Sequence, residues 1–223
     1  MSYMNQKSLM AVLTVVAMVF ATGCQTKQTT SSVNSQADLA FAGGADRPPT
    51  PTTLNAMARL LIGQNRDTEA AGVLRRVMLE HPNFVPAYVE MAGIHMRRGH
   101  VDRAIATLAT AHRISPKDPV VLNNIGMCWM MKNDAETALR YFVQASEVDP
   151  ENGRYWSNQA VALGTIGRYD ESLAFYMKLM EPAEAHYNVG VLCKSRNDLA
   201  RAEIEFQRAR DLGFVFEDEE KQG

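Results

Sequence analysis

Cysteine is scarce in this chain, and its spacing excludes the structures that depend on it. Three cysteines occur among 223 residues, at positions 24, 128 and 193, and no two of them form a C-x-x-C pair. The sequence therefore predicts neither a disulfide framework nor a zinc ribbon.

Signals for catalysis and for nucleic-acid binding are also missing. The five histidines show no H-E-x-x-H or other metal-ligand spacing, no glycine-rich phosphate loop occurs, and Ser195 lacks the glycines that surround a catalytic serine. We therefore predict no enzyme activity, no catalytic residue, no metal and no cofactor. The formal net charge of −2 argues against a general affinity for nucleic acid or acidic membranes.

The composition that is present favours helices. Apolar residues make up 46% of the chain and aromatic residues only 8%, while alanine, methionine and arginine are plentiful. The chain can therefore bury a sizeable, mainly helical core.

The first residues resemble a bacterial lipoprotein signal. Lys7 precedes the apolar run 9–23, which is too short for a confident membrane span and matches the hydrophobic part of a signal peptide. Ala21-Thr22-Gly23-Cys24 resembles a lipobox, which implies cleavage of a signal peptide at 1–23 and lipidation (palmitate among the acyl chains) of Cys24. Gln25 implies sorting to the outer membrane, facing the periplasm. The alternatives are an uncleaved anchor, or an ordinary signal peptide with an incidental cysteine.

The stretch after Cys24 predicts a tether. Residues 24–50 are rich in Ser, Thr, Gln, Gly and Pro and show no apolar period. We expect this linker to hold the folded part away from the membrane.

A repeat begins at Pro51. The segment 119–152 predicts two short helices joined by a turn, and it is similar to the tetratricopeptide repeat (TPR) pattern W-x2-L-G-x2-Y, A-x3-F and P with a period of about 34 residues. The matching residues are Leu122, Ile125, Gly126, Trp129, Ala138, Phe142 and Pro150.

The same register divides residues 51–213 into five units, 51–84, 85–118, 119–152, 153–182 and 183–213. Position 8 of each unit is small: Ala58, Ala92, Gly126, Ala160 and Gly190. Position 20 is also small: Ala70, Ala104, Ala138, Ser172 and Ala202. Position 24 is bulky: Leu74, Leu108, Phe142, Tyr176 and Phe206. The turn holds a residue type that tolerates a left-handed backbone: Asn65, Gly99, Asn133, Gly167 and Asn197.

The resemblance implies an all-α TPR superhelix, an α-solenoid of about five helix-turn-helix repeats with a concave surface lined by the first helices. Cys128 and Cys193 then fall at buried positions of units that are not adjacent, so free thiols are expected. The fourth unit is four residues short, which predicts a shortened second helix and an irregular step to the fifth unit. Gln159 stands at a core position that Met57 and Met91 occupy in the first two units, and both methionines are expected to be core.

In TPR arrays the inner groove is lined mainly by positions 2, 5, 6, 9, 12 and 13 of the first helices, which gives candidate ligand contacts. Position 6 is asparagine in three successive units, and an amide can donate to and accept from a peptide backbone. Methionines follow at neighbouring groove positions and favour adaptable apolar recognition, with scattered positive charges beside them. The predicted peptide-binding residues are Asn124, Asn158, Asn188, Met96, Met127, Met130, Met131, Arg154 and Lys194. The alternatives are that asparagine is simply common at this position and that the methionines are core.

The chain end 214–223 predicts an acidic, solvated tail, in which Phe214 and Phe216 either fold back over the last helix or meet a partner. As a whole the sequence resembles TPR lipoproteins of tight-adherence (Tad) and type IV pilus assembly. That resemblance implies an envelope scaffold whose partners are proteins or peptides, such as secretin or pilus components. An adaptor for peptidoglycan hydrolases or synthases is the alternative.

Overall fold

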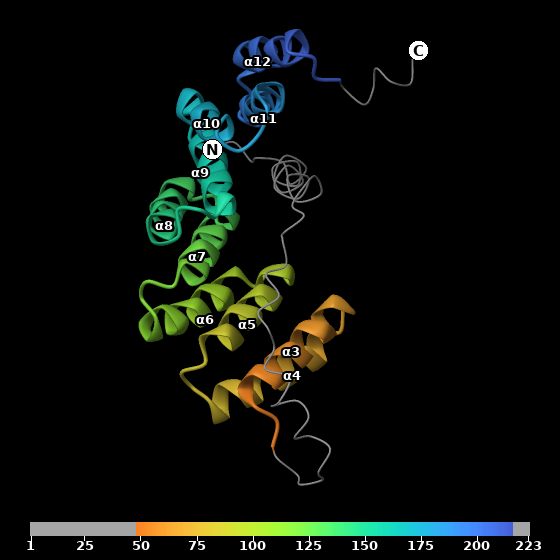
Figure 1. Ribbon diagram of the computed structural model, residues 1–223, viewed down its shortest axis with the longest axis vertical. Helices are drawn as coiled ribbons and strands as arrows, with labels where there is room; N and C mark the ends of the chain where they lie inside the picture. Colours follow the sequence, from red (N-terminus) through yellow and green to blue (C-terminus); the bar gives the residue numbers. More distant parts are fainter. Residues whose placement is uncertain (1–47, 216–223) are drawn as a thin grey trace.

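The computed structural model describes residues 48–215, which form five antiparallel helix pairs (Figure 1). The pairs are α3 (Pro51–Gly63) with α4 (Asp67–Glu80), α5 (Val85–Arg97) with α6 (Val101–Ile114), α7 (Pro119–Met131) with α8 (Ala135–Val148), α9 (Gly153–Thr165) with α10 (Tyr169–Tyr176), and α11 (Pro182–Ser195) with α12 (Leu199–Asp211). The predicted signal peptide, the predicted lipidation site Cys24 and most of the linker and tail lie outside the described residues. Within residues 48–215, no helix is both long and apolar enough to cross a membrane.

Local sequence explains where the helices start. Proline occupies the first turn of several first helices, where its missing N–H is not needed. Side chains cap others: Asp118 accepts from the backbone N–H groups of Val120 and Val121, and Asp134 accepts from that of Thr137. These caps satisfy donors that the helix itself leaves unpaired.

The turn residue inside each pair has the left-handed backbone that the sequence predicts. Asn65, Asn133 and Asn197 have φ of 60°, 61° and 63°, and Gly99 and Gly167 have φ of 72° and 88°. These are the residue types with the least steric penalty in that region, so the prediction is confirmed.

Small and bulky residues alternate across each pair as predicted. An added Cβ on Gly126 would lie 2.5 Å from the ring of Phe142, and one on Gly190 would lie 2.6 Å from Phe206. The pairs with alanine at position 8 have Leu or Tyr at position 24 instead. The phenylalanine ring therefore occupies the space that a Cβ at position 8 would need, so these two pairs require glycine there.

The core lies between units as well as within them. Met91 and Ile94 of α5 are buried in one cluster with Leu74 and Val77 of α4. Met57 is exposed, so the prediction that it is core is wrong. In the later units, the helix face that carries position 7 packs on the preceding unit. No described unit precedes the first one, so Met57 has nothing of this kind to pack on.

Gln159 is buried at the same register position and keeps its polar group satisfied. Its Nε2 donates to Ser146 Oγ at 2.6 Å, and Phe142 O lies 3.4 Å from the same nitrogen. A buried amide is tolerated here because the preceding unit supplies its acceptors.

The fourth unit is irregular. Helix α10 has 8 residues, whereas the second helices of the first three units have 14. With α10 shortened, α11 comes close to α9, and an added Cβ on Gly164 would lie 2.4 Å from Leu192. The fourth-to-fifth step therefore relies on a first-helix contact that needs glycine.

The array curves, and its first helices α5, α7 and α9 lie on the inner side of the curve while α6 and α8 lie outside (Figure 1). At the C-terminal end, the Phe214 ring stacks on Tyr187 with centroids 4.4 Å apart. Phe214 therefore folds back onto the array, but its ring packs on α11 and not, as predicted, over the last helix, α12. Phe216 lies outside the described residues.

Candidate functional site

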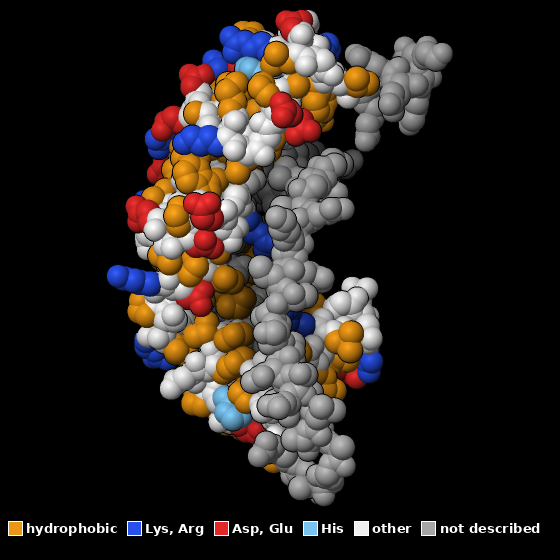
Figure 2. Space-filling view, in the orientation of Figure 1, with side chains coloured by type: hydrophobic (Ala, Val, Ile, Leu, Met, Phe, Trp, Pro, Cys, Tyr) orange, Lys and Arg blue, Asp and Glu red, His pale blue; other side chains and the backbone are white. Residues whose placement is uncertain are grey.

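The candidate site is the inner surface formed by the first helices, on the concave side of the curved array (Figure 1). Figure 2 shows hydrophobic side chains gathered along the middle of the visible face of the molecule. The structure places the three predicted asparagines on successive first helices, Asn124 on α7, Asn158 on α9 and Asn188 on α11. Asn124 is half-buried, whereas Asn158 and Asn188 are buried. The three amides are therefore not equally accessible to a ligand.

Hydrogen bonds inside the protein use two of these amides. Asn158 Nδ2 donates to Asn123 Oδ1 at 2.7 Å, and Asn188 Nδ2 donates to the Met180 sulfur at 3.1 Å. Within residues 48–215, the Asn124 amide has no hydrogen-bonding partner. Asn124 is thus the asparagine best placed to bond a ligand backbone.

Sequence reasoning missed Asn123. This residue is buried one position before Asn124, and its bond to Asn158 joins the third unit to the fourth on the floor of the inner surface. The sequence does contain a signal for this bond. Position 5 of one unit faces position 6 of the next unit, and both positions are asparagine only between the third and fourth units. The pair stabilises the spacing of α7 and α9.

The predicted methionines are all half-buried. Met96 packs on the core between units two and three, while Met127 and Met130 pack beside Ala138 and Phe142. Met96, Met127 and Met130 are therefore partly at the surface and partly packed on the core, so both sequence alternatives describe these three methionines. On α7, Asn124, Met127 and Met131 follow an i, i+3, i+7 spacing and share one face.

The charged side chains sit at the flanks. Arg154 on α9 and Lys194 on α11 are exposed. At the other end, Arg59 Nε lies 3.4 Å from Glu90 Oε1, and Arg97 Nη2 lies 2.7 Å from Asp67 Oδ1. Basic residues therefore stand on first helices to both sides of α7, and the two on the N-terminal side, Arg59 and Arg97, are ion-paired to carboxylates.

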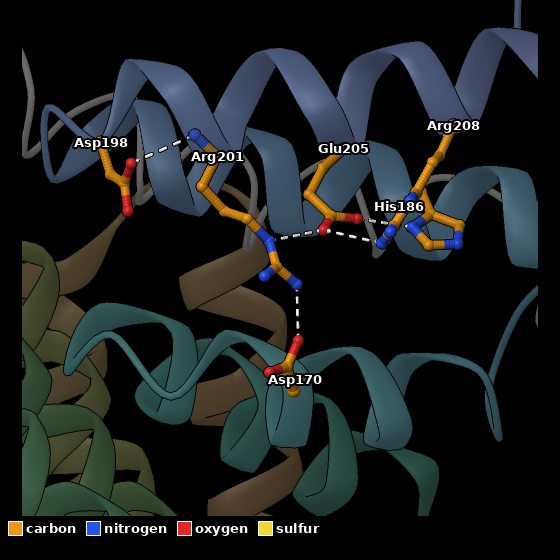
Figure 3. A network of polar contacts seen from close by, with 6 residues as sticks. All are labelled: Asp170, His186, Asp198, Arg201, Glu205 and Arg208. Carbon is orange, nitrogen blue, oxygen red and sulfur yellow. Dashed lines mark hydrogen bonds and ion pairs between the residues drawn. The ribbon is translucent and has the colours of Figure 1, made fainter.

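A buried carboxylate holds α11, the first helix of the fifth unit, in place (Figure 3). Glu205 of α12 is fully buried, and its Oε2 lies 2.6 Å from His186 Nδ1 of α11. Its Oε1 accepts from Arg201 Nε at 2.7 Å and lies 3.3 Å from Arg208 Nη1. Arg201 also donates to Asp170 Oδ1 of α10 at 2.5 Å. The network therefore ties the fifth unit to the fourth and positions Asn188 and Lys194.

This network replaces an apolar pair. Its residues occupy positions 4 and 23 of the unit, where the third unit has Leu122 with Tyr141 and the fourth has Trp156 with Phe175, whose ring centroids are 5.4 Å apart. A histidine at position 4 facing a glutamate at position 23 was the signal that sequence reasoning overlooked.

The thiols are buried and free, as predicted for Cys128 and Cys193. Burial raises the pKa of Cys128 to about 12 and is the largest cause that raises the pKa of Cys193 to about 11. Both therefore stay protonated and unreactive in the folded array at neutral pH. No group of three or more His, Cys, Asp or Glu side chains in residues 48–215 is placed to hold a metal ion.

The repeats themselves are matched by known families. Two family models, each described as a tetratricopeptide repeat, match residues 61–123 and residues 132–179. Together with the paired helices, these matches show that the chain contains TPRs and folds as a TPR solenoid.

Known proteins match this chain at low identity, one by sequence and two by structure. The mouse protein O-mannosyl-transferase TMTC1 is 23% identical over 130 residues, which are 56% of this chain but 14% of that protein, so the chain spans a small part of that relative. MamA from Desulfovibrio magneticus RS-1 has a TM-score of 0.60 at 13% identity, covering 73% of this chain and 94% of that one. YrrB, described as a TPR protein with an unusual peptide-binding site, has a TM-score of 0.57 at 18% identity, covering 80% of this chain and 91% of its own. The likenesses to MamA and YrrB support the fold.

Proposed function

We propose that this TPR array is a scaffold that binds an extended segment of a partner protein along its inner surface. The observation that carries the proposal is a half-buried stripe of α7, where the Asn124 amide, without a hydrogen-bonding partner among residues 48–215, lies on one helix face with Met127 and Met131. The peptide-binding site named for YrrB supports the same use of a similar fold.

The chemistry of that stripe suits a backbone ligand. An asparagine amide has two donors and one acceptor group, which match the C=O and N–H of an extended peptide. Methionine side chains adapt to differently shaped apolar residues, so they favour binding without strict sequence selection. Arg154 and Lys194 add positive charge at one end, which favours a partner segment that is apolar in the middle and acidic beyond it.

We further propose that the scaffold is anchored to the outer membrane through lipid on Cys24, facing the periplasm, and that it assists assembly of a Tad-like pilus or secretion system. The support is the lipobox-like Ala21-Thr22-Gly23-Cys24, the polar linker and the TPR array in one chain. Two or more acyl chains give stable membrane anchoring, and the linker gives the array reach.

Site-specific photocrosslinking in cells tests the inner surface. A benzophenone residue placed at Asn124 or Met131 should capture a partner, and mass spectrometry should locate the crosslink in an extended segment of it. Gln144, exposed on α8 at the outer side, is the matched control and should capture little. Capture that is equal at Gln144 and Asn124 would move the binding surface away from the first helices.

The identity of the captured protein separates the two partner classes. Secretin or pilus assembly components would support the pilus proposal, whereas peptidoglycan hydrolases or synthases would replace it with the adaptor function. Asn124→Ala should lower capture at Met131 several-fold with an unchanged helical CD signal, because only a ligand contact is removed.

Metabolic palmitate labelling tests the anchor separately. The chain should take up label, and Cys24→Ala should lose it. Label that persists in Cys24→Ala contradicts lipidation at this residue without affecting the inner-surface proposal.

A further inference from the structure

The two ends of the array expose different kinds of side chain. At the N-terminal end, α3 exposes two large apolar side chains on its outer face, with Met57 52% and Leu60 64% exposed. Thr53 lies one turn before Met57 on the same face and is also exposed. These three residues, at positions 3, 7 and 10 of the unit, define what we call the α3 face.

The same positions are buried in every later unit. The buried side chains are Ala87, Met91, Ile94, Val121, Ile125, Cys128, Tyr155, Gln159, Ala162, Ala185, Val189 and Leu192. In each case a helix of the preceding unit covers them: Met91 and Ile94 lie in one cluster with Leu74, and Ile125 and Cys128 lie in one cluster with Leu108. The α3 face therefore continues an interface that the protein builds four times over.

The C-terminal end is closed to a further unit. Position 21 faces the next unit and is apolar in the first four: Ala71, Ile105, Leu139 and Leu173. In α12 this position is Glu203, and Arg210 Nη1 lies 3.5 Å from its Oε1. Stacking α3 of one copy on α12 of another would bury this pair against apolar side chains, so a head-to-tail chain is disfavoured.

The α3 faces of two copies of the chain can instead pack on each other. Arg59 is the single charged residue of α3, and its guanidinium is directed to Glu90 of α5 rather than to the α3 face. Two copies can therefore meet across a twofold axis without opposing like charges, as an isologous contact requires. From the continuity of the face with the inter-unit interface and its lack of charge, we infer that α3 pairs with α3 of a second copy of this chain.

Cysteine crosslinking of the full chain in cells tests this pairing. Leu60→Cys with a short membrane-permeant bismaleimide should give a covalent homodimer, since a twofold contact brings the two positions together. Leu79, 83% exposed on α4 and away from the α3 face, is the matched control, and Leu79→Cys should label with a monofunctional maleimide but give no homodimer above the wild-type background. Wild type corrects for Cys24, while Cys128 and Cys193 are buried.

A charge variant gives an independent readout. Two differently tagged full-length copies should co-purify in mild detergent, and Met57→Glu with Leu60→Glu should lower that recovery at least tenfold, because the pairing would bring four carboxylates together. Leu79→Glu should leave it unchanged, and all variants should keep the wild-type CD spectrum. The inference is overturned if Leu60→Cys is fully labelled without homodimer, or if its crosslink leads to residues 1–47 of the same chain or to a different protein. It does not depend on the proposed function.

Discussion

Replacing Gly126 with alanine should destabilise the array, although the same change is usually favourable in a helix. Alanine gains about 1 kcal/mol over glycine in helix propensity. The added Cβ, however, would lie 2.5 Å from Phe142 Cε1, and the Phe142 ring is only 1% exposed and cannot move into solvent. Overpacking of this kind costs about 1–3 kcal/mol, so the expected net loss is about 1 kcal/mol.

A second substitution should rescue the first. Phe142→Leu alone leaves a cavity and costs about 1–2 kcal/mol, below the 3–5 kcal/mol of a Phe→Ala change. Combined with Gly126→Ala, it recreates the alanine–leucine pair that Ala58 and Leu74 form in the first unit. The double variant should therefore be more stable than the sum of the two single losses by about 1–2 kcal/mol.

Urea unfolding followed by helical CD measures these differences as shifts of the midpoint. Gly72, in the interior of α4 with nothing within 4 Å of an added Cβ, is the matched control, and Gly72→Ala should stabilise by about 0.5–1 kcal/mol. The reasoning is refuted if Gly126→Ala stabilises as Gly72→Ala does, or if the single effects of Gly126→Ala and Phe142→Leu add within about 0.5 kcal/mol.

Three further predictions concern the network, the turns and the thiols. Glu205→Ala should lower the free energy of unfolding by about 1.5–3 kcal/mol, and it should speed hydrogen exchange in α11 and α12 but not in α3–α6. Glu203→Ala, on the exposed face of α12, should produce neither effect. Asn133→Ala should cost about 1–2 kcal/mol because its φ is 61°, whereas Asn133→Gly should be near neutral by urea midpoint. Burial raises the pKa of Cys128 to about 12, so as the pH rises the thiol of the unfolded chain loses its proton before the thiol of the folded chain does. The free energy of unfolding should therefore fall above about pH 9, by up to ~1.4 kcal/mol per pH unit. Cys128→Ala should reduce this slope, and an unchanged slope would contradict the prediction.

The sequence by itself determined the repeat and its local geometry. The columns of small, bulky and turn residues are set by the helical period and by the cost of a left-handed backbone, and both act over a few residues. The five helix pairs, the positive φ of Asn65, Asn133 and Asn197, and the short α10 could therefore be predicted from spacing alone.

The tertiary structure alone decided which polar side chains are hydrogen-bonded inside the protein and which apolar side chains are buried there. Asn124 and Asn158 stand at the same position of successive units, but Asn158 bonds Asn123, which is 35 residues away, and Asn124 has no such partner among residues 48–215. Met57 and Met91 likewise share a position, but only Met91 has a described unit packed over it. Such differences depend on neighbours from another unit, so a repeat pattern places a residue on a helix face but does not determine what covers it.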